Sequence, residues 1–580
     1  MTVWLALALL VPSQNPVAPA AAQQGEESVL VTHDLRALLP RWDAGAGWSQ
    51  SLLVAPIASP SKELASVEDS LQYGELAAFE VQDLLGQILG DDLRREGRDL
   101  MVDGHTLTVL APPAQQEQVR AVLEALGSVM GATASVRVDV LTLGEGGGEA
   151  VPAGVISEEE AARLVTTLVG RGAKHESATL ELSTGRTAAF DAQRTIPFLF
   201  DYDVEIAQGI LVFEPVMART REGLCLVLRG AGVPGGLRLS SVCVRSERLG
   251  EIGELELRLS GLVNQGEGEG AQPLEGPSTV QSPDLRVSAF AFDTFLPDGK
   301  ALALTLETNL GAVRARELVL LRRAGGALGS YVARPVPRTS RTLIALDAGL
   351  FRPARLASWI EWDDDAERGL RPVLSTTLDG ELSGFLLQWL KARFSVWRRF
   401  GPWILIVTDP AWDRDAAAQL ERLVKAQRAP AGPRTLALDL RVGSSVPVRA
   451  RLPVLDGSSV GLVQARGRTA VLGYRVEVAQ GAAAPDPSVD SVFEGLAVTL
   501  ELQGPVLSAR GLVQLLDGPP GVLDPRYPVI GPIQRFEARR LRFDERFVLP
   551  EGRPGPVFVG GNAERGEGLV LELSVTGAAR

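Results

Sequence analysis

The chain has 580 residues, more than one hydrophobic core normally supports, so we expect roughly three to five domains. Its formal net charge of −13 argues against a nucleic-acid surface, which is normally basic, and we predict no nucleic-acid partner. The 61 glycines and 37 prolines indicate many turns rather than long helices.

The amino-terminal segment has the features of an export signal. An apolar run from Val3 to Val11 is followed by the small residues Ala20, Ala21 and Ala22. A run of about ten apolar residues is too short to span a bilayer, which needs about twenty. We therefore predict that residues 1–22 are a secretory signal peptide and that the chain is exported.

Residues 28–141 form the first predicted unit, in which strands alternate with helices. Val119 and Val122 recur at helical spacing, whereas Val136 and Val138 alternate as in a strand that faces a core. The predicted elements are a strand within 28–39, a helix over 79–89, a strand over 105–110, a helix over 119–126 and a strand over 136–140. This order predicts a compact unit of mixed secondary structure.

The residues that follow are predicted to be rich in strands, because short segments of alternating polar and apolar residues recur between Gly and Pro residues. A single helix is expected over 161–169. Ser157 can cap it, and Glu158 and Glu159 suit the positive end of the helix dipole. We assign residues 142–324 to a first β-rich domain.

The second half of the chain has the same order of elements. Strands are expected over 343–346, 404–407 and 436–440, and helices over 385–390 and 420–424. We assign residues 325–340 to a linker, residues 341–441 to a second strand-helix unit and residues 442–580 to a second β-rich domain. The predicted fold class is α+β: two tandem modules, each a small strand-helix-strand-helix-strand unit followed by a β-rich domain.

A motif in the first β-rich domain recurs in the second with a constant displacement of 272 positions (474 − 202 = 272). The motif is Tyr202, Val204, Glu205, Ile206, Ala207, Gln208 and Gly209, which recur as Tyr474, Val476, Glu477, Val478, Ala479, Gln480 and Gly481. A constant displacement is typical of a duplicated packing unit. Pro215 and Gly223 recur at the same displacement, and we expect them to shape turns.

Alternation along the motif predicts its two faces. Tyr202 and Val204 share an apolar face, and Glu205 and Glu477 lie opposite the apolar faces of their strands. These two glutamates are candidates to line a lumen or to pair between subunits. The alternative is that both are solvated on an outer face.

The stretch from Thr184 to Gln208 resembles the secretin-domain pattern of type II and type III secretion systems. It contains Thr184-Gly185-Arg186-Thr187-Ala188 and then an aromatic and acidic segment, and the run Arg466-Gly467-Arg468-Thr469-Ala470 is similar to its beginning. The small strand-helix unit that leads into a β-rich domain also resembles this family.

The resemblance implies a ring-forming protein of the periplasm or outer membrane, a structural or channel component of a type II/III-like secretion system. Its implied partners are further copies of itself and other envelope secretion-system proteins. Two alternatives stay open: a soluble periplasmic scaffold or binding protein that keeps the fold without forming a pore, and a secreted hydrolase with two facing carboxylates. Membrane association is left open as well.

Two cysteines, Cys225 and Cys243, lie symmetrically about Pro234 in a Gly-rich turn. If the flanking segments pair as a hairpin, the two sulfur atoms approach each other across adjacent strands. An oxidising compartment would then allow a disulfide. The alternative is two reduced, half-buried thiols that pack as small apolar groups.

No motif for catalysis or metal binding is evident, so we predict a protein that is not an enzyme and has no metal or cofactor. The histidines, His33, His105 and His175, have no metal-ligand spacing. The acidic residues within 361–367 are expected in a solvated loop rather than in a calcium site. Basic residues after Trp389 are expected to end a helix that packs this tryptophan inward, the alternative being an interfacial membrane or partner-binding helix.

Overall fold

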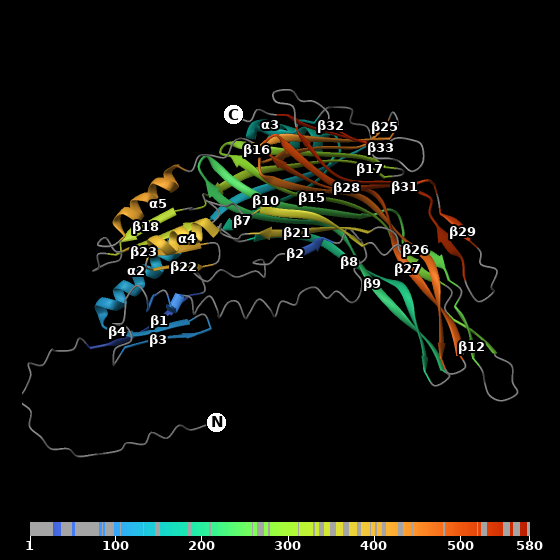
Figure 1. The fold of residues 1–580 in the computed structure, drawn as a ribbon, viewed down its shortest axis with the longest axis horizontal. Coiled ribbons are helices and arrows are strands. Elements are labelled where there is room, and N and C mark those ends of the chain that lie inside the picture. The colour runs from blue at the N-terminus through green and yellow to red at the C-terminus, as the bar shows by residue number, and fades with distance from the viewer. Residues whose placement is uncertain are drawn as a thin grey trace, which may run out of the picture.

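The computed structural model shows a molecule built mainly from strands, which form two large sheets and several small ones (Figure 1). The structure describes residues 27–35, 49–52, 81–83, 85–86, 98–104, 106–130, 133–144, 151–183, 187–207, 210–257, 259–263, 272–276, 279–310, 313–326, 328, 331–335, 341–347, 355–363, 371–379, 384–394, 396–400, 403–408, 413–426, 433–442, 445–479, 482–518, 520–523, 531–548, 557–560 and 569–576. The predicted signal peptide, residues 1–22, lies outside them.

Ten strands form the larger sheet, which contains both copies of the motif. They are β8 (Thr187–Ala207), β9 (Ile210–Val233), β10 (Gly236–Arg248), β12 (Ser260–Val263), β13 (Gln272–Glu275), β15 (Asp284–Pro297), β26 (Ser458–Ala479), β27 (Ala482–Gln503), β28 (Val506–Leu516) and β31 (Ala538–Val548). The hydrogen-bonded order is β13-β12-β27-β26-β15-β10-β9-β8, and β28 pairs with both β27 and β31. Both halves of the chain thus contribute strands to a single sheet.

Nine strands form the second large sheet. They are β5 (Thr133–Leu143), β6 (Gly154–Ser157), β7 (Lys174–Ser183), β16 (Lys300–Leu310), β17 (Val313–Gly326), β24 (Arg434–Val442), β25 (Ser445–Val454), β32 (Val557–Gly560) and β33 (Leu569–Thr576). Their order is β32-β33-β24-β25-β16-β17-β5-β7, with β6 beside β16. This sheet also combines strands from both halves.

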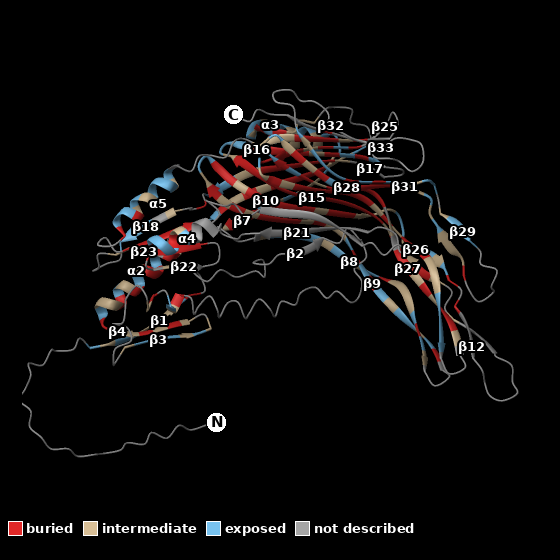
Figure 2. Ribbon diagram, in the orientation of Figure 1, coloured by how far each residue is buried: buried red, intermediate tan, exposed pale blue. Residues whose placement is uncertain are grey.

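The two large sheets pack face to face over one hydrophobic core. Val138 of β5 and Leu304 of β16 belong to the same cluster of buried side chains as Leu226 of β9 and Phe290 of β15. Alternate residues of each strand face this core, which is the arrangement of a β-sandwich. Buried residues accordingly concentrate where the two sheets overlap (Figure 2).

The remaining described strands form small sheets. They are β1 (Val29–Asp34), β3 (Asp99–Asp103) and β4 (Thr106–Ala111) in the order β1-β4-β3; β18 (Tyr331–Pro335), β19 (Thr342–Asp347), β22 (Val396–Phe400) and β23 (Trp403–Thr408) in the order β18-β19-β23-β22; β2 (Ser49–Leu52), β20 (Arg355–Asp363) and β21 (Arg371–Asp379) in the order β2-β21-β20; β11 (Gly253–Glu256) with β14 (Thr279–Ser282); and β29 (Gly521–Leu523) with β30 (Ile533–Arg535). The first two small sheets share a core, in which Leu107 and Val109 cluster with Leu343 and Trp403.

The described helices include α2 (Pro113–Met130), α3 (Glu158–Gly170), α4 (Gly384–Arg393) and α5 (Arg414–Ala426). The predicted start of α3 is confirmed, because the Ser157 hydroxyl accepts a hydrogen bond of 3.1 Å from the Glu160 backbone N–H. Ala161 then packs with Leu141 and Leu320 on the nine-stranded sheet. None of the helices in the described part of the chain has the length and apolar character needed to cross a membrane.

The predicted α+β class is wrong. Strands make up 73% of the described residues and helices 15%, so the fold is β-rich. One reason is β5, which we assigned to the first strand-helix unit but which pairs with β17 and β7 in the nine-stranded sheet. The segment 325–340, expected as a linker, likewise contains the end of β17 and all of β18. Pairing between distant segments, which local alternation does not encode, decided both outcomes.

The longest strands form two hairpins, β8–β9 and β26–β27, that extend beyond the sandwich (Figure 1). Tyr202 lies opposite Pro215, and Tyr474 lies opposite Pro487. Each hairpin also changes register once, between Leu199 and Asp201 in the first and between residues 471 and 473 in the second. The two bulges are 272 positions apart (471 − 199 = 272), so the hairpins bend at corresponding places.

Pro215 and Gly223 were expected in turns, but both lie inside β9. Gly223 and Gly495 have φ angles of +131° and +147°, which side chains rarely tolerate. A Cβ atom on Gly495 would lie 2.0 Å from the Gln464 carbonyl oxygen on the neighbouring strand. Glycine therefore permits close approach of two strands at this point.

Replacing Gly495 by alanine should lower the stability of the second hairpin by about 1–3 kcal/mol, because the backbone must leave a conformation that only glycine adopts easily. Thermal unfolding followed by circular dichroism measures the change. Gly473→Ala is the matched control in the same hairpin, since a Cβ atom there meets nothing within 4 Å. Equal midpoints for the two variants would contradict the strain at residue 495.

Candidate assembly interface

The candidate site is the joint at which strands from the two halves of the chain pair. In the ten-stranded sheet the first half contributes β8-β9-β10-β15 and the second contributes β26-β27-β28-β31, and β15 pairs with β26. In the nine-stranded sheet, β7-β5-β17-β16 meets β25-β24-β33-β32 through pairing of β16 with β25. In each sheet, four strands of each half therefore follow one another in the same relative order, and these two sets are joined head to tail. Three further strands of the first half, β6, β12 and β13, lie outside these sets.

Polar side chains tie this joint together. The Arg466 guanidinium on β26 binds the Asp284 carboxylate on β15, with 2.7 Å from Nε to Oδ1 and a second contact through Nη2. Two hydroxyls donate to the buried Gln464 Oε1: Thr308 Oγ1 at 2.7 Å and Ser288 Oγ at 3.2 Å. Gln464 thus links the two sheets, because Thr308 belongs to the nine-stranded sheet and Ser288 to the ten-stranded one.

A group of buried charges lies between the sheets beside the joint. Arg245 on β10 is 7% exposed and lies 3.8 Å from Glu317 and 3.6 Å from Glu176 on the opposite sheet. Glu317 is 2% exposed, and burial raises its pKa while the guanidinium groups of Arg245 and Arg286 lower it. Arg286 also pairs with Glu247. The pair of Arg245 with Glu317 thus joins the two sheets with both side chains almost fully buried, where removal of one partner is costly.

The two hairpins also pack against each other outside the sandwich. Val204 and Leu211 of the first hairpin form a buried cluster with Ala484 of β27. Near this contact, burial together with the neighbouring carboxylates of Asp486 and Asp203 raises the pKa of Asp201 to about 7. The contact between the hairpins therefore contains a carboxyl group that gains a proton more readily than an exposed one.

The structure places the motif residues on these hairpins. Tyr202, Val204, Glu205 and Ala207 lie on β8, and Tyr474, Val476, Glu477 and Ala479 lie on β26, whereas Gln208, Gly209, Gln480 and Gly481 fall outside the described residues. Val204 is 2% exposed, but the corresponding Val476 is 60% exposed. Glu205 and Glu477 are both exposed in the single chain.

The disulfide considered between Cys225 and Cys243 does not form, and both residues are free cysteines. Cys225 lies opposite Val244, while Cys243 lies opposite Leu226, so the two sulfur atoms are one position out of register on adjacent strands. Side chains alternate between faces, and Cys243 accordingly faces the sandwich core while Cys225 packs on the other face. Burial raises the pKa of Cys225 to about 11.

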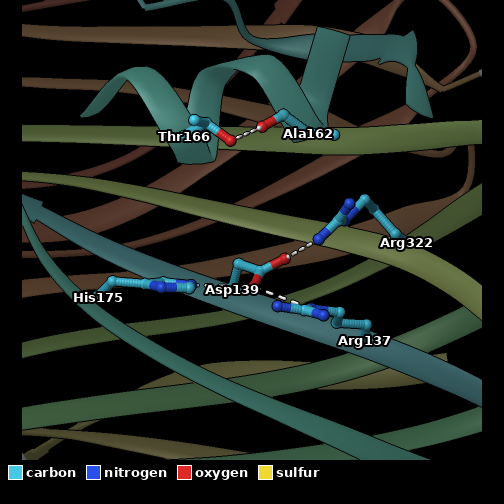
Figure 3. A network of polar contacts seen from close by, with 6 residues as sticks. All are labelled: Arg137, Asp139, Ala162, Thr166, His175 and Arg322. Carbon is cyan, nitrogen blue, oxygen red and sulfur yellow. Dashed lines mark hydrogen bonds and ion pairs between the residues drawn. The ribbon is translucent and has the colours of Figure 1, made fainter. Parts of the chain in front are cut away.

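A second polar network surrounds the buried Asp139 on β5 (Figure 3). Arg322 Nη2 donates to Asp139 Oδ2 at 2.6 Å, Arg137 Nε donates to Oδ1 at 3.1 Å, and His175 Nε2 lies 3.0 Å from Oδ1. Burial alone would raise the pKa of Asp139, but the hydrogen bonds from Arg322 and His175 lower it below its usual value. The network ties β5 to β7 and β17.

The corresponding strand of the second half has a similar pair. Arg451 on β25 binds Asp439 on β24 through two hydrogen bonds, of 2.7 Å to Oδ1 and 3.2 Å to Oδ2. A bidentate Arg–carboxylate pair fixes the geometry of adjacent strands. Asp139 and Asp439 therefore position strands in the same sheet.

Other candidate residues are not brought together. His33 lies on β1 and His175 on β7, and His105 is outside the described residues, as are the side chains of 361–367. Among the described residues no group of three His, Cys, Asp or Glu side chains has the geometry to hold a metal ion. Trp389 of α4 packs edge to face on Phe394, with 5.7 Å between ring centroids, in agreement with the expected inward packing.

The sequence analysis missed the charged residues that lie between the sheets, Arg245 and Glu317. A signal for them exists, because each follows apolar residues at even spacing on a strand whose alternate positions face a core. Cys243 and Arg245 lie on one face of β10, and Glu317 and Val319 lie on one face of β17. Alternation predicts this inward position, but it does not identify the partner strand.

The fold and the joint define a β-rich protein in which two sets of strands follow one another in both sheets of a sandwich. Neither a protein-family model nor a curated protein matches the sequence. Comparison of the fold finds the secretin domain of InvG from the Salmonella SPI-1 injectisome, which is 11% identical with a TM-score of 0.21. The match covers 51% of this chain and 85% of the InvG chain.

A second similar structure is the ETEC pilotin–secretin complex AspS–GspD. It is 12% identical with a TM-score of 0.21, and the match covers 45% of this chain and 63% of that chain. The low sequence identities and TM-scores of the two matches describe a distant likeness of fold, secretin-like at most. They do not place the chain in the secretin family.

Proposed function

We propose that this chain is a structural protein of a bacterial-type envelope that assembles from many copies into a closed ring, as a secretin-like component of a type II/III-like secretion system. The observation that carries the proposal is the head-to-tail joint of β15 with β26 and of β16 with β25. When two like units join head to tail, the head of one unit and the tail of the other stay unpaired and can bind further units. Repeated contacts of this kind close into a ring when the rotation between units permits.

Three further observations support the proposal. The sequence predicts an export signal over residues 1–22, which fits a protein of the periplasm or outer membrane, and the stretch 184–208 resembles the secretin-domain pattern. The matching registers of the two hairpins support a duplicated module. In this proposal the protein acts by assembly rather than by catalysis, and its partners are further copies of itself and other envelope proteins of the secretion system.

Purified protein should form discrete oligomers as its concentration rises, and negative-stain images should show rings. Multi-angle light scattering over a concentration series measures the mass of each species. A protein that stays monomeric at the highest concentration would contradict the proposal and favour a periplasmic scaffold that has the fold without the ring.

A further inference from the structure

We propose that a second copy of this chain adds its β8 edge to the β31 edge of the first, and that the register is the one that β15 and β26 have within a single chain. This inference rests on the proposed function and names the contact by which copies join. Within the described residues, β8 pairs only with β9, and β31 pairs only with β28. The second edge of each of these two strands is therefore open to a further strand.

The register follows from counting through paired residues. In the first set of strands Phe290 lies opposite Cys243, and in the second set Phe543 lies opposite Gly511. Cys243 and Gly511 are themselves paired with residues 226 and 498, which are 272 positions apart (498 − 226 = 272). Phe543 on β31 therefore occupies the place that Phe290 has on β15.

The same counting places residues of β8 where those of β26 lie. Phe290 pairs with Leu462 across the internal joint, and Leu462 corresponds to Phe190 of β8 (462 − 272 = 190). Phe543 of one copy thus comes opposite Phe190 of the next. Phe543 is 5% exposed and Phe190 is partly buried on the same core, so the contact continues the sandwich core from copy to copy.

The neighbouring pair supplies opposite charges. Within the chain, Ala289 and Val463 lie opposite each other and belong to one buried cluster. At the proposed contact their places are taken by Arg542 of one copy and Asp191 of the next, both of which are exposed in the single chain. Opposite charges directly across two antiparallel strands are favourable, and they also disfavour a slipped register.

The hairpins supply independent evidence from exposed apolar residues. Inside the chain, Val204 of the first hairpin is buried against Ala484 of the second. The corresponding residues are Val476 of the second hairpin and Val212 of the first, which are 60% and 43% exposed. Stacking the next copy in the same direction brings Val476 of one copy against Val212 of the next and covers both. Exposed valines at positions that are buried in the other hairpin are expected if a further copy completes the packing.

Cysteine cross-linking tests the register. The variant Asp191→Cys/Arg542→Cys should form a ladder of covalent multimers on a non-reducing gel under mild oxidation, because the two thiols lie opposite each other across the contact. The variant Asp191→Cys/Arg540→Cys is the matched control, since its thiols are two residues out of register, about 7 Å apart along the strand. We expect at least tenfold less multimer from the control. Both variants also carry Cys225→Ala, because Cys225 lies directly opposite residue 191 on the adjacent strand and its thiol would compete for the bond. Cys243 stays in place, since it is buried in the core between the sheets.

A second variant tests the hairpin contact without new cysteines. Val476→Asp should raise the concentration needed for assembly at least tenfold, whereas Val522→Asp on β29, also exposed at 62%, should leave it unchanged. Oligomers in light scattering together with equal cross-linking of the two cysteine variants would overturn the proposed contact but not the ring. A monomer at every concentration would overturn both.

Discussion

Replacing Arg245 by methionine should destabilise the sandwich by about 3–5 kcal/mol at pH 8, because the buried carboxylate of Glu317 loses its nearest guanidinium. Loss of Arg245 also raises the pKa of Glu317 further, since that guanidinium lowers it in the intact chain. The folded variant then holds a proton that the unfolded chain releases at lower pH. The difference in the free energy of unfolding between the wild type and the less stable variant should therefore grow as the pH rises.

Urea denaturation at pH 5 and pH 8, followed by tryptophan fluorescence, measures this effect. The matched control is the double variant Arg245→Met/Glu317→Leu, which removes both charges and should recover most of the lost stability. If Arg245→Met and the double variant unfold at the same urea concentration at pH 8, the ion pair between the sheets does not stabilise the fold in the way the geometry indicates.

Replacing Asp201 by asparagine should stabilise the hairpins at pH 8 by up to about 4 kcal/mol, since one pKa unit corresponds to about 1.4 kcal/mol. Burial raises the pKa of Asp201 from its ordinary value of 3.8 to about 7. Between these two values the folded state holds a proton that the unfolded state releases, so the free energy of unfolding falls as the pH rises from about 4 to about 7. Asparagine removes the ionisation and with it this part of the pH dependence.

Hydrogen exchange of the hairpin amides, measured from pH 5 to pH 8 with correction for the intrinsic exchange rate, tests the prediction. The wild-type protection factors should fall as the pH approaches 7, and those of Asp201→Asn should stay nearly constant. Glu254→Gln replaces an exposed carboxylate on β11 and should follow the wild-type curve. A variant Asp201→Asn with the wild-type pH profile would exclude the carboxyl of Asp201 as the cause.

Much of the local structure could be predicted. The helices expected over 119–126, 161–169, 385–390 and 420–424 are present as α2, α3, α4 and α5. The strand over 136–140 is also present, and its valines face the core as their alternation indicated. These predictions succeeded because side-chain periodicity reports directly on which face of an element is buried.

Strand length could not be predicted. Pro215 and Gly223 suggested turns, yet both lie inside β9, which runs from Ile210 to Val233. Gly223 is needed there because its strand approaches the carbonyl oxygen of Ala192 on β8 too closely for a Cβ atom. A glycine at a close approach and a glycine in a turn look alike in the sequence, and only the partner strand distinguishes them.

The sequence by itself determined which side chains of a strand such as β5 face inward, and it placed matching residues 272 positions apart on two hairpins. Only the tertiary structure decided that β15 pairs with β26, that Arg245 meets Glu317 and that Val476 is exposed where Val204 is buried. The reason is physical. Alternation depends on neighbours along the chain, whereas the choice of a partner strand and its register depends on contacts between segments far apart in sequence.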